Sequence, residues 1–210
     1  MDIGYIAIVI GVVLLSMTLH EAMHAFMGYW LGDDTAKLQG RLTLNPIKHI
    51  DPILTILLPV MLAIVGGPIF GGAKPVTFNQ DRVRYDEWGA ALVAVAGPLT
   101  NLIIAFVAYG AYVLVGGLNA GLLGEILMIA VVVNLGFFIF NMLPIPPLDG
   151  SRVLYALAPE FIRRGMEAIE RLGIIVILII VLAASSLIGA FMGQSIDFFV
   201  DLFTRIFGSS

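Results

Sequence analysis

The sequence predicts an all-α polytopic membrane protein, because its composition and its long apolar runs both differ from those of a soluble domain. Of its 210 residues, 60% are hydrophobic and 12% are charged, and the mean hydropathy is +1.01. A soluble domain has about a quarter of its residues charged, since a surface in water needs ionised groups. We therefore expect residues 1–210 to form a single membrane-embedded domain.

Charge and cysteine content exclude several classes of protein and site. The formal net charge is −4, so the chain lacks the excess of positive charge that a nucleic-acid partner requires. The sequence contains no cysteine. Disulfides and thiolate zinc sites are therefore excluded, and His, Asp and Glu remain as candidate metal ligands.

Apolar runs recur along the chain, and we expect about five to six membrane segments. A helix over residues 3–30, rising about 1.5 Å per residue, is longer than the roughly 30 Å hydrocarbon core. Residues 89–123 lack charged side chains and hold either two spans or one span and a loop, with a turn near residues 116–119. Residues 122–143 form a further span that ends at Pro144, because proline removes a helix donor.

The C-terminal third of the chain alternates between amphipathic and apolar stretches. Residues 151–171 read as a basic, amphipathic connection, and residues 174–192 as the last clear span. Residues 195–207 contain charged side chains and are expected to form a short amphipathic tail.

Basic residues indicate the orientation, since Lys and Arg collect on the cytoplasmic side of membrane proteins. Most of them occur in three groups: Lys37, Arg41 and Lys48; Arg82 and Arg84; and Arg152, Arg163, Arg164 and Arg171. If the first two groups are both cytoplasmic, residues 52–72 cannot cross the membrane once. Their Gly and Pro interruptions favour a re-entrant hairpin, which is tolerated where protein or a water-filled cavity surrounds it.

The most informative motif lies near the C-terminal end of the first span, where His20, Glu21 and His24 follow the pattern His-Glu-x-x-His. On a helix, residues four apart lie on one face, so both imidazoles can reach one metal ion. Glu21 lies about 100° round the helix, close enough to hold a water beside that metal. This pattern predicts a zinc site for hydrolysis.

The histidines also allow a non-catalytic interpretation. His20 and His24 could be interfacial histidines at the end of a span, but ionisable groups inside an apolar span are costly and by default functional. His49 is the remaining histidine, and it lies in a polar loop. We expect His49 to be solvated or interfacial and not to be a ligand.

Asp149 is the preferred third ligand, because a catalytic zinc site needs three protein ligands and an open position. It follows a proline-rich stretch just beyond a span that should return to the side of His24. The alternative is that Asp149 caps the helix beginning at Ser151, a role worth about 1 kcal/mol.

Three asparagines lie in or beside apolar spans. Asn101 and Asn134 could form hydrogen bonds between helices, worth roughly 0.6 kcal/mol on average, or could act near the site, and the sequence leaves both open. Asn141 is seven residues after Asn134 and on the same helix face. We expect Asn141 to lie beside the metal and to bind substrate backbone or the oxyanion.

Several motifs of the sequence resemble those of a known family. They are the His-Glu-x-x-His motif of residues 20–24, the Gly-Pro-Leu-Thr-Asn of residues 97–101 and the Asn-Met-Leu-Pro-Ile-Pro-Pro-Leu-Asp-Gly of residues 141–150, with further likeness in the loops at 40–46 and 72–76. The chain is similar to the site-2 proteases, which are intramembrane zinc metalloproteases. It resembles their short prokaryotic type, which lacks PDZ and CBS domains.

The resemblance covers most of residues 11–155, the expected catalytic core, and leaves residues 156–210 as C-terminal helices. It implies one Zn²⁺ per chain, bound by His20, His24 and Asp149, with Glu21 as the acid–base and Asn141 in contact with substrate. It also implies short β-strands near residues 66–80 that pair with an unwound substrate. The substrates would be transmembrane proteins, cut within the bilayer of a prokaryotic cell membrane by an active site near the cytoplasmic side.

Other classes of membrane protein make different demands on the sequence than a zinc protease does. An intramembrane serine protease would need a buried serine with a distant histidine, and an aspartyl type would need a partner for Asp149. The main alternative from another class is a non-catalytic membrane protein that binds or transports metal through His20, His24 and Asp149. A structural scaffold would bind no stoichiometric zinc. Substrate identity and oligomeric state are left open by the sequence.

Overall fold

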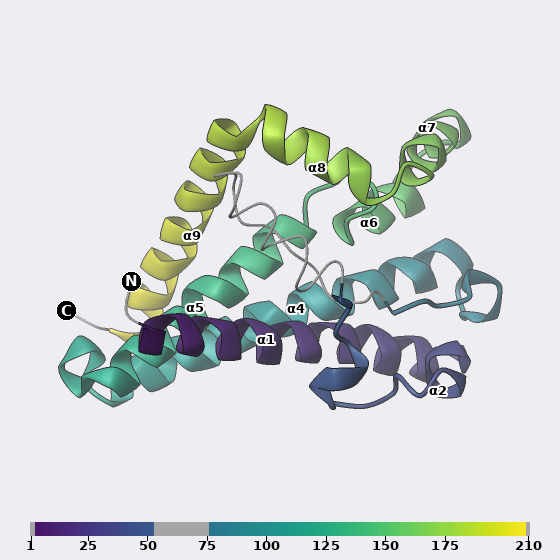
Figure 1. The fold of residues 1–210 in the computed structure, drawn as a ribbon. Helices are drawn as coiled ribbons and strands as arrows, with labels where there is room; N and C mark the ends of the chain where they lie inside the picture. Colours follow the sequence, from purple (N-terminus) through teal and green to yellow (C-terminus); the bar gives the residue numbers. More distant parts are fainter. Residues whose placement is uncertain (1–2, 53–75, 209–210) are drawn as a thin grey trace.

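The computed structural model describes residues 3–52 and 76–208, and the regular elements in these residues are helices (Figure 1). The longer elements are α1 (Ile3–Trp30), α4 (Asp86–Leu114), α5 (Leu122–Asn141), α6 (Gly150–Leu157), α7 (Glu160–Glu170), α8 (Ile174–Ala183) and α9 (Ser185–Phe207). The short elements are α2 (Thr35–Leu38) and the 3₁₀ turns η1 (Pro46–Lys48), η3 (Gln80–Arg82) and η4 (Gly117–Ala120).

Four of these helices, α1, α4, α5 and α9, are long and apolar enough to cross a membrane. The prediction of an all-helical, multi-pass membrane protein is therefore confirmed for the described residues. The re-entrant hairpin expected at residues 52–72 lies almost wholly in residues 53–75, outside the described residues. Of the expected strand region near residues 66–80, the described residues 76–79 form no strand, and Gln80 begins the short turn η3.

Helix α4 is the centre of the bundle and packs against α1, α5, α6 and α9. It is continuous from Asp86 to Leu114 despite an internal proline, so residues 89–123 form one span and a loop, not two spans. Buried glycines and alanines fill its first half: Gly89, Ala90, Ala91, Ala94, Ala96 and Gly97. Small residues let helix backbones approach closely, which is how membrane helices gain packing contacts without a hydrophobic driving force.

The C-terminal helices differ from the prediction. The expected span at residues 174–192 is broken at Ala184, whose backbone leaves the helical region at φ −121° and ψ 26°. The expected tail at residues 195–207 is instead the second half of α9, a candidate span. The prediction was wrong because the charged side chains there suggested an interface, whereas packing against α4 and α5 sets the helix.

An aromatic and aliphatic cluster joins α9 to α4 and α5. Phe203 is buried together with Tyr109 of α4 and Leu135 of α5. The Phe203 ring lies 5.8 Å from that of Tyr109 and 5.3 Å from that of Phe106. Because α8 and the start of α9 are not part of this cluster, α9 is fixed chiefly through its C-terminal half (Figure 1).

One polar contact lies inside this cluster. The Thr204 hydroxyl donates to Val200 O at 2.8 Å, so the Tyr109 hydroxyl donates to Thr204 Oγ1 at 2.6 Å. We expect a double-mutant cycle of Tyr109→Phe and Thr204→Val to give a coupling of about 0.6 kcal/mol in unfolding from mixed micelles. Tyr112→Phe, also on α4, is the matched control and should show no coupling to Thr204→Val. A zero coupling for Tyr109 would contradict this contact.

Candidate active site

The two histidines of the motif lie on the buried face of α1. His20 and His24 are 6% and 8% exposed, and their Nε2 atoms are 3.0 Å apart. His20 is ten residues before the last residue of the helix, about 15 Å along its axis. The site is therefore within the span and not at its end.

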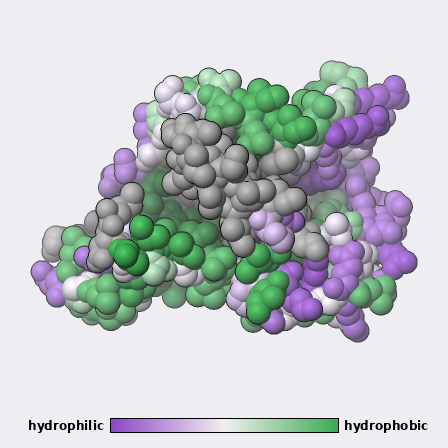
Figure 2. Space-filling view, viewed as in Figure 1, coloured by the Kyte–Doolittle hydropathy of each residue, from purple (hydrophilic) through white to green (hydrophobic). Residues whose placement is uncertain are grey.

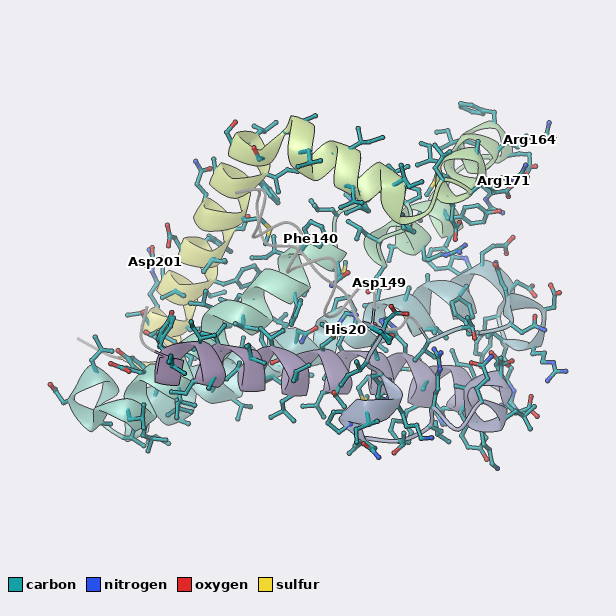
Figure 3. All side chains as sticks on the ribbon, viewed as in Figure 1. His20, Phe140, Asp149, Arg164, Arg171 and Asp201 are labelled. Atoms are coloured by element: carbon teal, nitrogen blue, oxygen red, sulfur yellow. The ribbon has the colours of Figure 1, made fainter. Side chains whose placement is uncertain are left out.

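Asp149 meets these histidines from another part of the chain (Figure 3). Its Oδ2 lies 3.2 Å from His20 Nε2 and 3.4 Å from His24 Nε2. Its side chain makes no capping hydrogen bond to α6, so the capping role considered from the sequence is not the one it takes here. The turn that delivers it is tight, because a Cβ on Gly150 would lie 2.3 Å from Met142 O.

Both imidazole rings use Nδ1 for hydrogen bonds to the protein. His24 Nδ1 lies 2.7 Å from Val93 O, a carbonyl that can only accept, so this nitrogen donates. His20 Nδ1 donates to Asn101 Oδ1 at 2.6 Å. In a neutral imidazole the other nitrogen then carries a lone pair. Two lone pairs and a carboxylate oxygen thus converge within 3.4 Å, which is the donor set that a divalent metal requires.

Glu21 lies beside this donor set. Its carboxylate, His20 and His24 offer ligand atoms that all lie within 4.8 Å of one another. Glu21 Oε2 accepts a hydrogen bond from the backbone N–H of Val76 at 2.9 Å. The described residue that follows the 53–75 stretch therefore fixes one oxygen of the carboxylate next to the histidines.

Comparison with known proteins identifies the family. Residues 118–184, which include Asp149, match the model of peptidase family M50. The chain is 38% identical over 203 residues to YwhC of Bacillus subtilis (strain 168), covering 92% of this chain and 90% of that protein. It is 32% identical over 194 residues to Rip2 of Mycobacterium tuberculosis (strain ATCC 25618 / H37Rv), covering 90% of this chain and 72% of Rip2. Both relatives carry provisional names as zinc metalloproteases.

The chain belongs to peptidase family M50, the site-2 protease family. It is a zinc-dependent protease of the membrane, as the motifs predict. No solved structure matches the chain. The donor set of this M50 protease fits zinc, because nitrogen and carboxylate ligands without thiolates are common in catalytic zinc sites.

One predicted residue, His49, is placed differently from expectation, and the role of a second, Asn141, stays a prediction. Asn141 is the last residue of α5, and its side-chain amide donates to Phe137 O at 3.0 Å, one turn back along the helix. The structure thus engages Asn141 within α5 and gives it no hydrogen bond to the histidines or Asp149 among the described residues. His49 is buried at 2% exposure, and its ring is bonded to Thr43 O at 2.9 Å. The prediction of a solvated His49 was wrong, because the ring is buried against its own loop, whereas an interfacial position and the absence of a ligand role stay predictions.

Several groups that shape the site of the protease have no direct signal in the sequence. The Val93 carbonyl and the Val76 N–H are backbone groups and have no residue signature. Gly97 is different: a Cβ there would lie 2.4 Å from His24 Nε2 and 2.8 Å from His20 Cε1. The Gly-Pro pair in α4 is a signal for such a close approach, because glycine allows a second group to reach the backbone.

Gly97→Ala tests this close approach. The added methyl group overlaps both imidazoles, so we expect the purified variant to lose stoichiometric zinc and proteolytic activity. Zinc content by atomic emission is the measurement. Gly136→Ala on α5 is the matched control, since no described atom lies within 4 Å of its added Cβ, and it should keep its zinc. Full zinc occupancy in Gly97→Ala would show that the packing around the histidines is looser than described.

Proposed function

We propose that His20, His24 and Asp149 bind the catalytic zinc and that Glu21 is the general acid–base in peptide hydrolysis. The observation that carries this proposal is the convergence of two lone pairs from buried imidazoles and one partly buried carboxylate. A carboxylate beside them, not needed to complete the three protein ligands, suits a proton carrier.

Zinc and the side chain of Glu21 have different roles in the proposed reaction. Zinc, when bound, supplies a Lewis acid that polarises the scissile carbonyl and lowers the pKa of the attacking water. Glu21 takes a proton from that water as its oxygen attacks the carbonyl carbon. As the C–N bond breaks, Glu21 passes the proton to the leaving nitrogen, so that the products are a carboxylate and an amine. The Val76 N–H holds Glu21 Oε2 in place during this exchange.

Asn141 is proposed to bind the substrate backbone or the developing oxyanion, the role expected from its place in the motif. It lies at the C-terminal end of α5, eight residues before Asp149, and its side chain is only partly buried. The hydrogen bond to Phe137 O uses one N–H of the amide. The second N–H and the carbonyl oxygen are the groups that an extended peptide backbone would meet.

A paired experiment tests these roles. We expect Glu21→Gln to keep its zinc but to lose at least about 100-fold in cleavage of a model transmembrane substrate, because it removes the proton carrier. We expect Asp149→Ala to lose zinc and activity together. A metal transporter would tolerate Glu21→Gln, and full zinc and activity in Asp149→Ala would show that the third ligand is wrong.

The proposed orientation places the active site near the cytoplasmic side. The basic segments meet at one end of the bundle: Arg84 N donates to Leu31 O at 2.9 Å, and Arg163 of α7 pairs with Glu87 of α4 at 2.9 Å. Figure 2 shows hydrophilic surface gathered at this end. The turn η4 at the opposite end of α4 carries no Lys or Arg. This arrangement supports a cytoplasmic position for α2 and α7. The hairpin at residues 52–72 stays a prediction.

Single cysteines test this orientation, because the chain has none of its own. Lys37 in α2 and Asn119 in η4 are both exposed and lie at opposite ends of the bundle. In intact cells, a membrane-impermeant thiol reagent should label Asn119→Cys and should label Lys37→Cys only after the cells are opened. The reverse pattern would place the active site near the outer side.

A further inference from the structure

A continuous chain of side-chain hydrogen bonds leads from His20 through two other membrane helices and back to α1. Asn101 Oδ1 on α4 accepts from His20 Nδ1 at 2.6 Å, and Asn101 Nδ2 donates to Asn134 Oδ1 at 2.8 Å. Asn134 Nδ2 on α5 then donates to Ser16 Oγ at 2.9 Å. Both asparagines have 0% exposure. Ser16 lies one turn before His20 on the same helix, so the chain closes on α1.

The direction of every bond in this chain is fixed by a backbone carbonyl. Asn134 Nδ2 also lies 2.8 Å from Ala130 O, which can only accept, so this atom is the amide nitrogen. The remaining atom of that amide, Oδ1, must then accept from Asn101 Nδ2. It follows that Asn101 presents its oxygen to His20, and that His20 Nδ1 is the protonated nitrogen.

The protonated Nδ1 leaves the His20 Nε2 lone pair directed at Asp149 and His24. A ring held in the other tautomer would place a proton on Nε2, where a metal must bind. We propose that Asn101 and Asn134 are positioning residues that hold His20 in its metal-binding tautomer and orientation. This proposal rests on His20 being a zinc ligand, as argued above.

The two histidines differ in the kind of group that orients their rings. His24 is oriented by the Val93 carbonyl, a backbone group of α4 that substitution of Val93 does not remove. His20 is oriented by an amide whose own position depends on α5. Loss of Asn101 should therefore affect one ligand and leave the other oriented. Outer-shell partners of metal-ligating histidines typically contribute 10- to 100-fold to metal affinity.

The test compares zinc affinity with fold stability in four detergent-purified proteins. They are the wild type, Asn101→Leu, Asn101→Asp and Thr100→Val. Affinity is measured by competition with a chelator, and the visible absorption of bound Co²⁺ reports the ligand geometry independently of proteolysis. Thr100→Val is the matched control, because the Thr100 hydroxyl donates to Ala96 O within α4 and takes no part in the chain.

We expect Asn101→Leu to bind zinc about 10- to 100-fold more weakly and to change the Co²⁺ spectrum, because the Nδ1 proton loses its acceptor. Asn101→Asp keeps an acceptor oxygen but loses the donor to Asn134. It should bind zinc more tightly than Asn101→Leu while unfolding at a lower temperature than the wild type. Thr100→Val should match the wild type in zinc affinity.

Two results would overturn the proposal. One is wild-type zinc affinity in folded Asn101→Leu. The other is a zinc affinity that follows unfolding temperature across all variants, as expected if the asparagines only join helices. If Asn101→Leu does not fold, Asn134→Leu takes its place: we expect weakened zinc binding, and unchanged binding would refute the role. His20→Ala distinguishes a failure of the positioning role from a failure of the ligand assignment. Full zinc binding in that variant would refute the assignment of His20 as a ligand.

Discussion

The structure depends on one electrostatic constraint: the Nε2 atoms of two buried imidazoles, which are acceptors in the neutral rings, and an oxygen of a partly buried carboxylate face one another within 3.0–3.4 Å. Such a group is repulsive unless a cation joins it, and charge in hydrocarbon is costly. Two contacts offset part of that cost. Both Nδ1 atoms donate hydrogen bonds to oxygen atoms of α4, and the turn before α6 holds Asp149 beside the histidines. The packing of α1, α4 and α6 therefore brings together the residues that are proposed to bind zinc.

Helix α4 makes this arrangement possible because it has a glycine where it meets the two histidines of α1. Gly97 lies directly against both imidazoles, and its Cα hydrogen occupies the place of a methyl group that would meet His24 Nε2 at 2.4 Å. The same close approach brings the Val93 carbonyl to His24 and the Asn101 amide to His20. Small residues that serve helix packing elsewhere in membranes here also set the distance between ligands and their supporting groups.

The sequence predicted what depends on local periodicity and missed what depends on tertiary contacts. His20 and His24 follow from helical spacing, and Asp149 from its depth relative to the end of α5. The span of α9 was missed because its charged residues obscured an aromatic face, with Phe199, Phe203 and Phe207 one turn apart, that only packing reveals. The burial of His49 depends on the path of its own loop. The supporting carbonyl of Val93 and the N–H of Val76 have no side-chain signature at all.

The contact between Val76 and Glu21 links the site to residues 76–79. A carboxylate has two oxygens and about four lone-pair positions, so the one N–H bond from Val76 does not use up the capacity of Glu21 to accept hydrogen bonds. The contact therefore orients Glu21 without blocking it. A second hydrogen bond also holds residues 76–79. The backbone N–H of Asn79 donates to the carboxylate of Asp33 at 2.6 Å, and Asp33 is a buried residue just beyond the end of α1. Because both acceptors belong to α1 and the turn that follows it, the two hydrogen bonds couple the position of the Glu21 carboxylate to that of residues 76–79.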